Sequence, residues 1–94
     1  MEGRVGLMSK VPFGVVTRKN ISENVKHLRK IHGLTQHDFA DLMHIPRSRV
    51  ARVEAFIKKD GFTMEQINKI CEVFGIEETL FVGDHDAFVK RLAL

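Results

Sequence analysis

The chain has 94 residues, of which 44% are hydrophobic, and this is enough for one domain with a modest core. The single cysteine, Cys71, cannot form an internal disulfide, and no Cys/His spacing is typical of a zinc site. No apolar run is long enough to span a membrane, and the N-terminus lacks the features of a signal peptide. We therefore expect a cytoplasmic domain without disulfides or membrane attachment.

The net charge of +3 is unevenly distributed along the chain. Residues 1–34 hold seven Lys/Arg and two Asp/Glu, residues 35–61 hold five and four, and residues 62–94 hold three and six. A basic front and an acidic rear suit a polyanion bound on one face. The alternative is a solvated surface whose charge is merely uneven.

Residues 1–19 form an N-terminal extension before any helical period begins. Val11, Phe13 and Val15 alternate with less apolar neighbours, which is a weak strand signal, and Pro12 restricts such a strand to an edge. The segment is also basic. It fits a disordered tail, an arm on DNA, or a strand that pairs with a partner chain.

The first helix is predicted over residues 20–32. Asn20 and Glu23 have the spacing of a capping box, and Gly33 suits the C-terminal end. The helix carries one apolar stripe at helical spacing. Its members are Ile21, Val25, Leu28 and Ile31.

Residues 34–54 predict two short helices joined by a tight turn. Thr35 can cap the first, because its hydroxyl can accept a hydrogen bond from the Asp38 amide. Pro46 suits the start of the second. The inward apolar positions are Phe39, Ala40, Met43, Ile45, Val50 and Val53. The second helix therefore has an apolar back, and it carries Arg47, Ser48, Arg49 and Arg52 at its start and on its outer face. The DNA major groove accepts such a helix.

Three further helical segments are predicted after residue 61. The first is predicted over residues 63–74, because Thr63 and Gln66 have the spacing of a capping box at its start. Within it, Cys71 is expected to be a small buried residue. A short helix follows within residues 76–82. Residues 83–94 form a helical tail that Asp84 or Asp86 can cap. Its apolar side, formed by Phe88, Val89 and Leu92, must be covered by its own core or by another subunit, and we favour a subunit.

The sequence offers no chemistry for an enzyme. None of the five histidines forms an i, i+4 pair, so no metal site is expected. No glycine-rich phosphate loop and no Ser/His/Asp order is present. We expect no catalytic residues and no cofactor.

The Gln36 after the capping Thr35, the Phe-Ala pair and the Arg-Ser…Val…Arg-Val-Glu run resemble the helix-turn-helix of the Cro/repressor-like (XRE-type) regulators. The resemblance covers residues 20–82 and implies an all-α, five-helix lambda-repressor-like helix-turn-helix domain. The chain departs from the family pattern at His44, Pro46 and Phe56, where the family often has Gly, Ser or Thr, and Gly. His44 is therefore expected to adopt a positive φ.

The resemblance also implies roles for several residues. Gln36 would approach a phosphate, Arg47, Ser48 and Arg52 would face base edges, and Arg29 would pair with Glu54. Apart from the resemblance, we expect phosphate contacts from Arg49, Lys58 and Lys59. The predicted DNA-binding set is thus Gln36, Arg47, Ser48, Arg49, Arg52, Lys58 and Lys59.

The sequence therefore predicts a transcriptional regulator that binds specific double-stranded DNA, as a repressor homodimer on an inverted repeat. Two surfaces are candidates for the dimer contact: the C-terminal face, which we favour, and the segment around Phe13. The alternative function is an antitoxin or another protein-interaction module built on the same fold.

Overall fold

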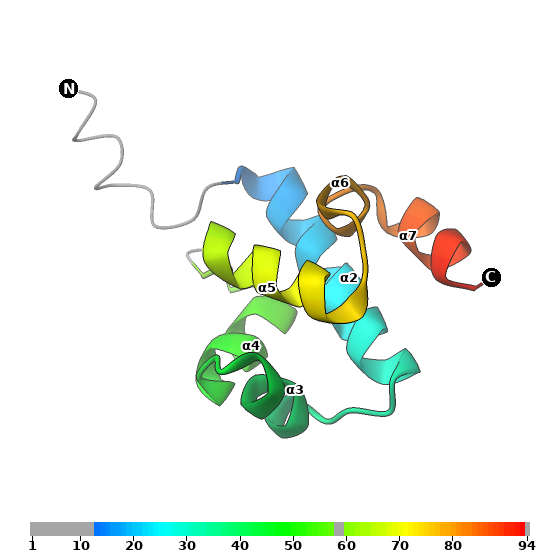
Figure 1. Ribbon diagram of the computed structural model, residues 1–94. Helices are drawn as coiled ribbons and strands as arrows, with labels where there is room; N and C mark the ends of the chain where they lie inside the picture. Colours follow the sequence, from blue (N-terminus) through cyan, green and yellow to red (C-terminus); the bar gives the residue numbers. More distant parts are fainter. Residues whose placement is uncertain (1–12, 58–59, 94) are drawn as a thin grey trace.

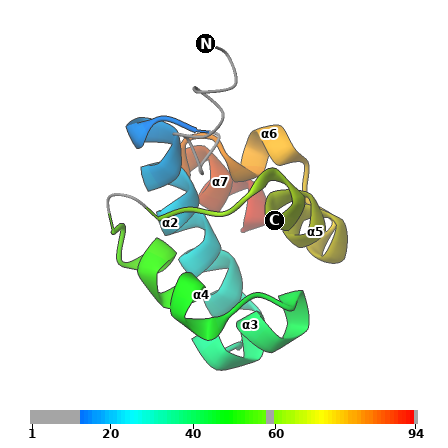
Figure 2. The same cartoon turned by 90° about the vertical axis from the view of Figure 1, so that its left-hand side faces the viewer.

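The computed structural model describes residues 13–57 and 60–93, and these residues form six α-helices. The helices are α2 (Val15–Ile31), α3 (Gln36–Met43), α4 (Arg47–Glu54), α5 (Met64–Phe74), α6 (Glu78–Phe81) and α7 (His85–Leu92). Helix α2 packs against α4, α6 and α7, while α3 contacts both α4 and α5. Figures 1 and 2 show α3 and α4 at one end of the molecule and α6 and α7 nearer the other. The all-α prediction is confirmed.

Helix α2 begins at Val15, five residues before the predicted start, so the capping box at Asn20 was wrong. Asn20 lies inside the helix, and its side-chain amide donates to the Val82 carbonyl over 3.4 Å. The predicted strand was also wrong for Phe13 and Val15. Phe13 packs against the core, and Val15 is the first residue of α2. The third residue of that pattern, Val11, lies outside the described residues.

One apolar core joins all six helices of the described chain. Its fully buried aromatic side chains are Phe39, Phe62, Phe81 and Phe88. The predicted inward positions of α3 and α4 are buried, and so is Cys71 of α5, whereas Phe74 at the end of α5 is only half-buried. Burial raises the pKa of Cys71 to about 11, so its thiol stays protonated at neutral pH. Ile31 is the exception in the α2 stripe, since 48% of it is exposed.

Phe88 corrects the sequence-based assignment of a dimer contact. It is completely buried, and its ring packs edge-on against Phe81 at a centroid distance of 6.1 Å. The chain itself therefore covers this residue, so Phe88 does not present a surface to another subunit. Leu92 also packs against the core, and both Leu92 and Val89 are half-buried, so of the three predicted contact residues these two keep some exposed surface.

Asn24 holds α7 in place through a fully buried side chain. Its Nδ2 donates to the carbonyl of Phe81 over 2.8 Å and to that of Gly83 over 2.9 Å. The Asn24 Oδ1 lies 2.8 Å from Nδ1 of His85, which must carry the proton because the amide oxygen can only accept. Gly83 is required at this turn, because a Cβ there would approach the Thr79 carbonyl oxygen to 2.8 Å.

Candidate nucleic-acid interface

Hydrogen bonds and backbone geometry define the start of α3 and the turn that joins α3 to α4. Thr35 Oγ1 accepts from the Asp38 amide over 3.0 Å, and the Asp38 carboxylate accepts from the Thr35 amide over 3.2 Å. Both hydrogen bonds with Thr35 lower the pKa of Asp38, and the bond from the Thr35 amide has the larger effect. After α3 the backbone turns at His44, whose φ of 58° is the expected positive value. Pro46 then precedes the first residue of α4.

A buried ion pair fixes α4 against α2. Arg29 Nε donates to Glu54 Oε2 over 2.8 Å, and Arg29 Nη2 donates to Glu54 Oε1 over 2.7 Å. Only 2% of the Glu54 side chain and 12% of the Arg29 side chain are exposed. The hydrogen bonds to Glu54 raise the pKa of Arg29, although burial acts in the opposite direction. The structure thus contains the pair that the family resemblance implies.

Two further side chains, Gln36 of α3 and Ser22 of α2, also bond to Glu54, so the cluster connects α2, α3 and α4. Gln36, in the first turn of α3, donates from Nε2 to Glu54 Oε1 over 3.0 Å. The hydroxyl of Ser22 in α2 donates to the Glu54 backbone carbonyl over 3.0 Å. The third bond of Arg29, from Nη1 to the Leu34 carbonyl, spans 2.9 Å. Because a bidentate guanidinium–carboxylate pair has a fixed geometry, this cluster sets the orientation of α3 and α4 relative to α2.

The opposite side of α4 is open to solvent. Val50 and Val53 are buried on its inner side, while Arg47 and Ser48 at its start are exposed. The side chain of Arg52, one turn further, is 59% exposed and donates from Nε to Asp60 Oδ2 over 2.7 Å. These are the three residues for which the family resemblance implies contacts with base edges.

Arg49 is placed differently from the expected phosphate contact. It is half-buried, and its Nη1 donates to the carbonyl of Gly61 over 2.8 Å. Its guanidinium therefore holds the loop after α4, which is a structural role that its position in an arginine-rich run does not reveal. Lys58 and Lys59, which were assigned to phosphates, lie outside the described residues.

The loop after α4 takes a strained path. Phe56 has a φ of 56°, a region that few bulky residues adopt, and it occupies the position where the resemblance places Gly. The guanidinium of Arg18 lies 5.9 Å from the centre of the Phe56 ring. This positive φ was not predicted from the sequence, although a bulky residue at a position where the family often has Gly was a usable signal.

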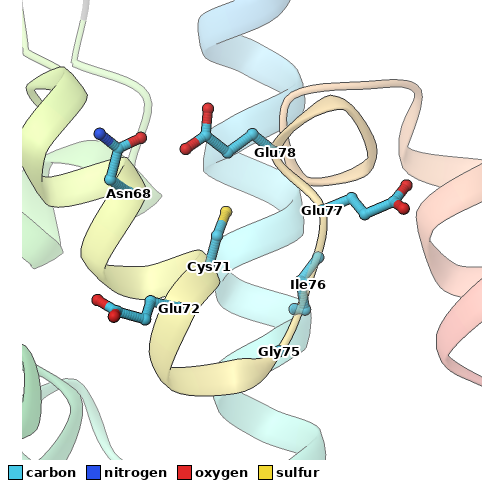
Figure 3. A pocket seen from close by; sticks show the side chains of 7 residues that line it. All are labelled: Asn68, Cys71, Glu72, Gly75, Ile76, Glu77 and Glu78. Carbon is cyan, nitrogen blue, oxygen red and sulfur yellow. The ribbon is translucent and has the colours of Figure 1, made fainter.

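A hollow between α5 and α6 is lined by acidic residues, in contrast to the arginines of α4. Its volume is about 390 Å³. Its lining includes Cys71 and the acidic residues Glu72, Glu77 and Glu78, and Figure 3 shows the Cys71 thiol pointing toward Glu78 while the Glu77 carboxylate turns away. Three carboxylates repel a polyanion, so this side of the molecule does not suit nucleic acid.

The arrangement of α2 to α6 around a capped turn is that of a helix-turn-helix DNA-binding domain. The profile of the helix-turn-helix family matches residues 25–81, and the chain belongs to this family, in its XRE-type branch of transcription regulators. Among curated proteins it is similar to the antitoxin PezA of Streptococcus pneumoniae serotype 4 (strain ATCC BAA-334 / TIGR4), with 36% identity over 64 residues.

The similarity to PezA is partial. It covers 68% of this chain but only 39% of the relative's length. No solved structure matches the chain at a significant level. In the part of the chain that the structure describes, no helix has the length and apolar character needed to cross a membrane.

Proposed function

We propose that this protein binds a specific double-stranded DNA sequence through the exposed side of α4 and represses transcription in the cytoplasm. One observation carries the proposal: Arg47, Ser48 and Arg52 face solvent on a helix whose opposite side is buried and anchored through Glu54. An arginine can bond O6 and N7 of guanine together, so a half-site that contains guanine is expected.

The first turn of α3 supplies the second element of the interface. The Gln36 side chain is committed to Glu54 through one of its N–H groups. The backbone amides at the start of α3 carry partial positive charge, and a helix N-terminus favours an anion. We propose that a DNA phosphate lies at this helix start, where Gln36 links the phosphate contact to the anchor of α4.

The test is a binding measurement on a site selected from a random library of duplexes. Arg47→Ala should weaken binding to the selected site by about 1–3 kcal/mol and weaken binding to a scrambled duplex less. Arg91→Ala is the matched control, because Arg91 is also exposed but lies in the last turn of α7. If Arg47→Ala and Arg52→Ala both leave affinity and site preference unchanged, α4 does not read the sequence.

We further propose that the protein binds as a homodimer on an inverted repeat, because one such helix covers few base pairs. Two apolar surfaces can join the subunits: Val89 with the edge of Leu92 on α7, and the exposed Val15 and Val16 at the start of α2. A two-fold dimer should separate its α4 helices by about 34 Å, one DNA turn. Light scattering should show a dimer, and a monomer at micromolar concentration both free and on DNA contradicts this proposal.

A second candidate function is that of an antitoxin, which binds a partner protein. The similarity to a protein named antitoxin PezA favours it. A gel shift on the DNA that flanks the protein's own gene, with and without the product of the neighbouring gene, separates the two candidates. A simple repressor shifts the DNA alike in both cases, whereas an antitoxin forms a larger complex or releases the DNA when the neighbour's product is added.

A further inference from the structure

The loop after α4 supplies a carboxylate to one of the exposed arginines. Asp60 Oδ2 accepts from Arg52 Nε over 2.7 Å. The Asp60 side chain is 22% exposed, whereas that of Arg52 is 59% exposed. The pair therefore has a mostly buried, fixed acceptor and a donor whose far end reaches into solvent on the outer side of α4.

Asp60 is itself held from two directions. Its amide donates to the Ile57 carbonyl over 2.9 Å, and its carbonyl accepts from Arg18 Nη1 over 3.4 Å. The same turn is tied to α4, because the Ile57 amide donates to the Arg52 carbonyl over 3.0 Å. The carboxylate thus has a defined position relative to α4 and to α2, so it can define the position of the guanidinium in turn.

The hydrogen bond leaves one particular edge of Arg52 available. A guanidinium has five N–H groups in a rigid fork, and Asp60 takes the one on Nε. Nη1 and Nη2 make no hydrogen bond to any described residue. These two nitrogens present parallel N–H groups, which is the pattern that matches O6 and N7 of guanine.

We propose that Asp60 is a specificity-determining positioning residue, which holds Arg52 so that its two terminal nitrogens face a guanine. This inference rests on the proposed function of α4. A long flexible side chain loses conformational freedom when it binds, and a side chain that is already held loses less. The fixed direction also penalises bases that lack the two acceptors of guanine.

The charge of Asp60 separates this role from simple attraction to DNA. A carboxylate at the interface repels phosphates, and it neutralises the charge of Arg52 toward every sequence alike. Asp60 therefore lowers affinity for unspecific DNA while it raises preference for the specific site. Loss of the carboxylate should move the two affinities in opposite directions, which a purely electrostatic role cannot do.

The test uses the full chain, a duplex selected by the wild-type protein and a scrambled duplex of the same length. Asp60→Asn should bind the selected duplex several-fold more weakly and the scrambled duplex more tightly, so the ratio of the two affinities falls about tenfold. Asp86→Asn is the control, because it removes the same charge from an exposed position on α7. Equal tightening on both duplexes by Asp60→Asn overturns the proposal.

A second readout addresses the guanine directly. Replacement of each guanine of the selected site by 7-deazaguanine removes the N7 acceptor. One replacement should weaken the wild-type protein and leave Arg52→Ala unaffected, and Asp60→Asn should lose most of the wild-type sensitivity at that position. If Asp60→Asn keeps the full sensitivity, Asp60 does not position Arg52.

The controls separate the failure of this inference from the failure of the proposed function. If Arg52→Ala abolishes the preference and Asp60→Asn preserves it, only the positioning role fails. If no duplex is selected, or if Arg47→Ala and Arg52→Ala both preserve the preference, the proposed function fails and takes this inference with it. Thermal melts check folding, and Asp60→Glu, which keeps the charge but displaces the carboxylate, should give the same fall in ratio if Asp60→Asn does not fold.

Discussion

Helix α2 is anchored to its neighbours by two polar side chains, Arg29 near its C-terminal end and Asn24 near its middle, and the chemistry of the two anchors differs. Near the α3–α4 turn, Arg29 and Glu54 form a charged, bidentate pair that Gln36 joins. Toward α6 and α7, the neutral amide of Asn24 bonds two backbone carbonyls and His85. The bidentate guanidinium–carboxylate pair has a fixed geometry and so orients whole helices, whereas the amide provides hydrogen bonds to backbone carbonyls that would otherwise lack a donor. The charged anchor lies behind the proposed DNA-binding side.

The largest expected effect is the loss of one partner of the charged anchor. Glu54→Gln removes the carboxylate and leaves the guanidinium of Arg29 buried without a countercharge. The expected cost is about 3–5 kcal/mol of unfolding free energy, because an uncompensated buried charge is strongly unfavourable. Denaturant unfolding followed by circular dichroism measures it.

A double-mutant cycle with Arg29→Met sharpens this result. The double variant should be more stable than the sum of the single losses implies, because it leaves no unpaired charge. Additive losses would mean that the two residues do not interact in solution.

The neutral anchor should show a smaller loss. Asn24→Ala leaves the carbonyls of Phe81 and Gly83 without their buried donor, and the expected cost is about 2–4 kcal/mol. The variant should also lower the protection of α7, and amide hydrogen exchange of residues 85–92 can detect this. Asn20→Ala is the control, because Asn20 donates to the nearby Val82 carbonyl only over 3.4 Å. Equal losses for the two asparagines would contradict a special role of Asn24.

Loss of a helix cap at the α3–α4 end or at the α6–α7 end should lower stability by a smaller and similar amount. Thr35 caps α3 and Asp84 caps α7, each through an oxygen that accepts from a backbone amide. Thr35→Ala and Asp84→Ala should each cost about 1 kcal/mol in thermal or denaturant unfolding. Only Thr35→Ala should also weaken DNA binding, since it loosens the start of α3. A loss of DNA binding in Asp84→Ala but not in Thr35→Ala would contradict the assignment of DNA binding to the α3–α4 end.

The smallest expected effect is a dependence on pH at the start of α3. Hydrogen bonding to Thr35 lowers the pKa of Asp38 from its usual 3.8, so the folded state prefers the ionised carboxylate. The stabilisation is therefore present above pH 4 and is lost as the pH falls through the lowered pKa. Asp38→Asn should remove this part of the acid dependence of stability, and identical acid profiles for the two proteins would contradict it.

The α3–α4 end could be predicted from sequence in greater detail than the α6–α7 end. Its caps, its inward valines and the positive φ of His44 follow from local rules and from the family pattern. Phe88 was misassigned because a helical apolar period shows that one side is apolar but not what covers it. The start of α2 was misplaced because Asn20 and Glu23 fit a capping box, whereas contacts of Arg18 and Phe13 with distant residues favour a longer helix.

Within the candidate site, the exposed arginines could be found from sequence, but their partners could not. Arg49 and Arg52 stand in one run, yet one holds the Gly61 carbonyl and the other the Asp60 carboxylate. Both partners lie in an irregular loop eight to twelve residues away, where no periodicity links them to α4. Folding of that loop, rather than composition, decides which arginine remains open to DNA.

If the α3–α4 end meets DNA through the outer side of α4, an NMR titration should locate the contact there. Isotope-labelled protein is titrated with the selected duplex while its amide and arginine Nε–H signals are followed. We expect the largest chemical-shift changes at Gln36 and across residues 47–52, with the Arg52 side chain among them. Shifts confined to α5, α6 and α7, with α4 unchanged at saturation, would contradict it.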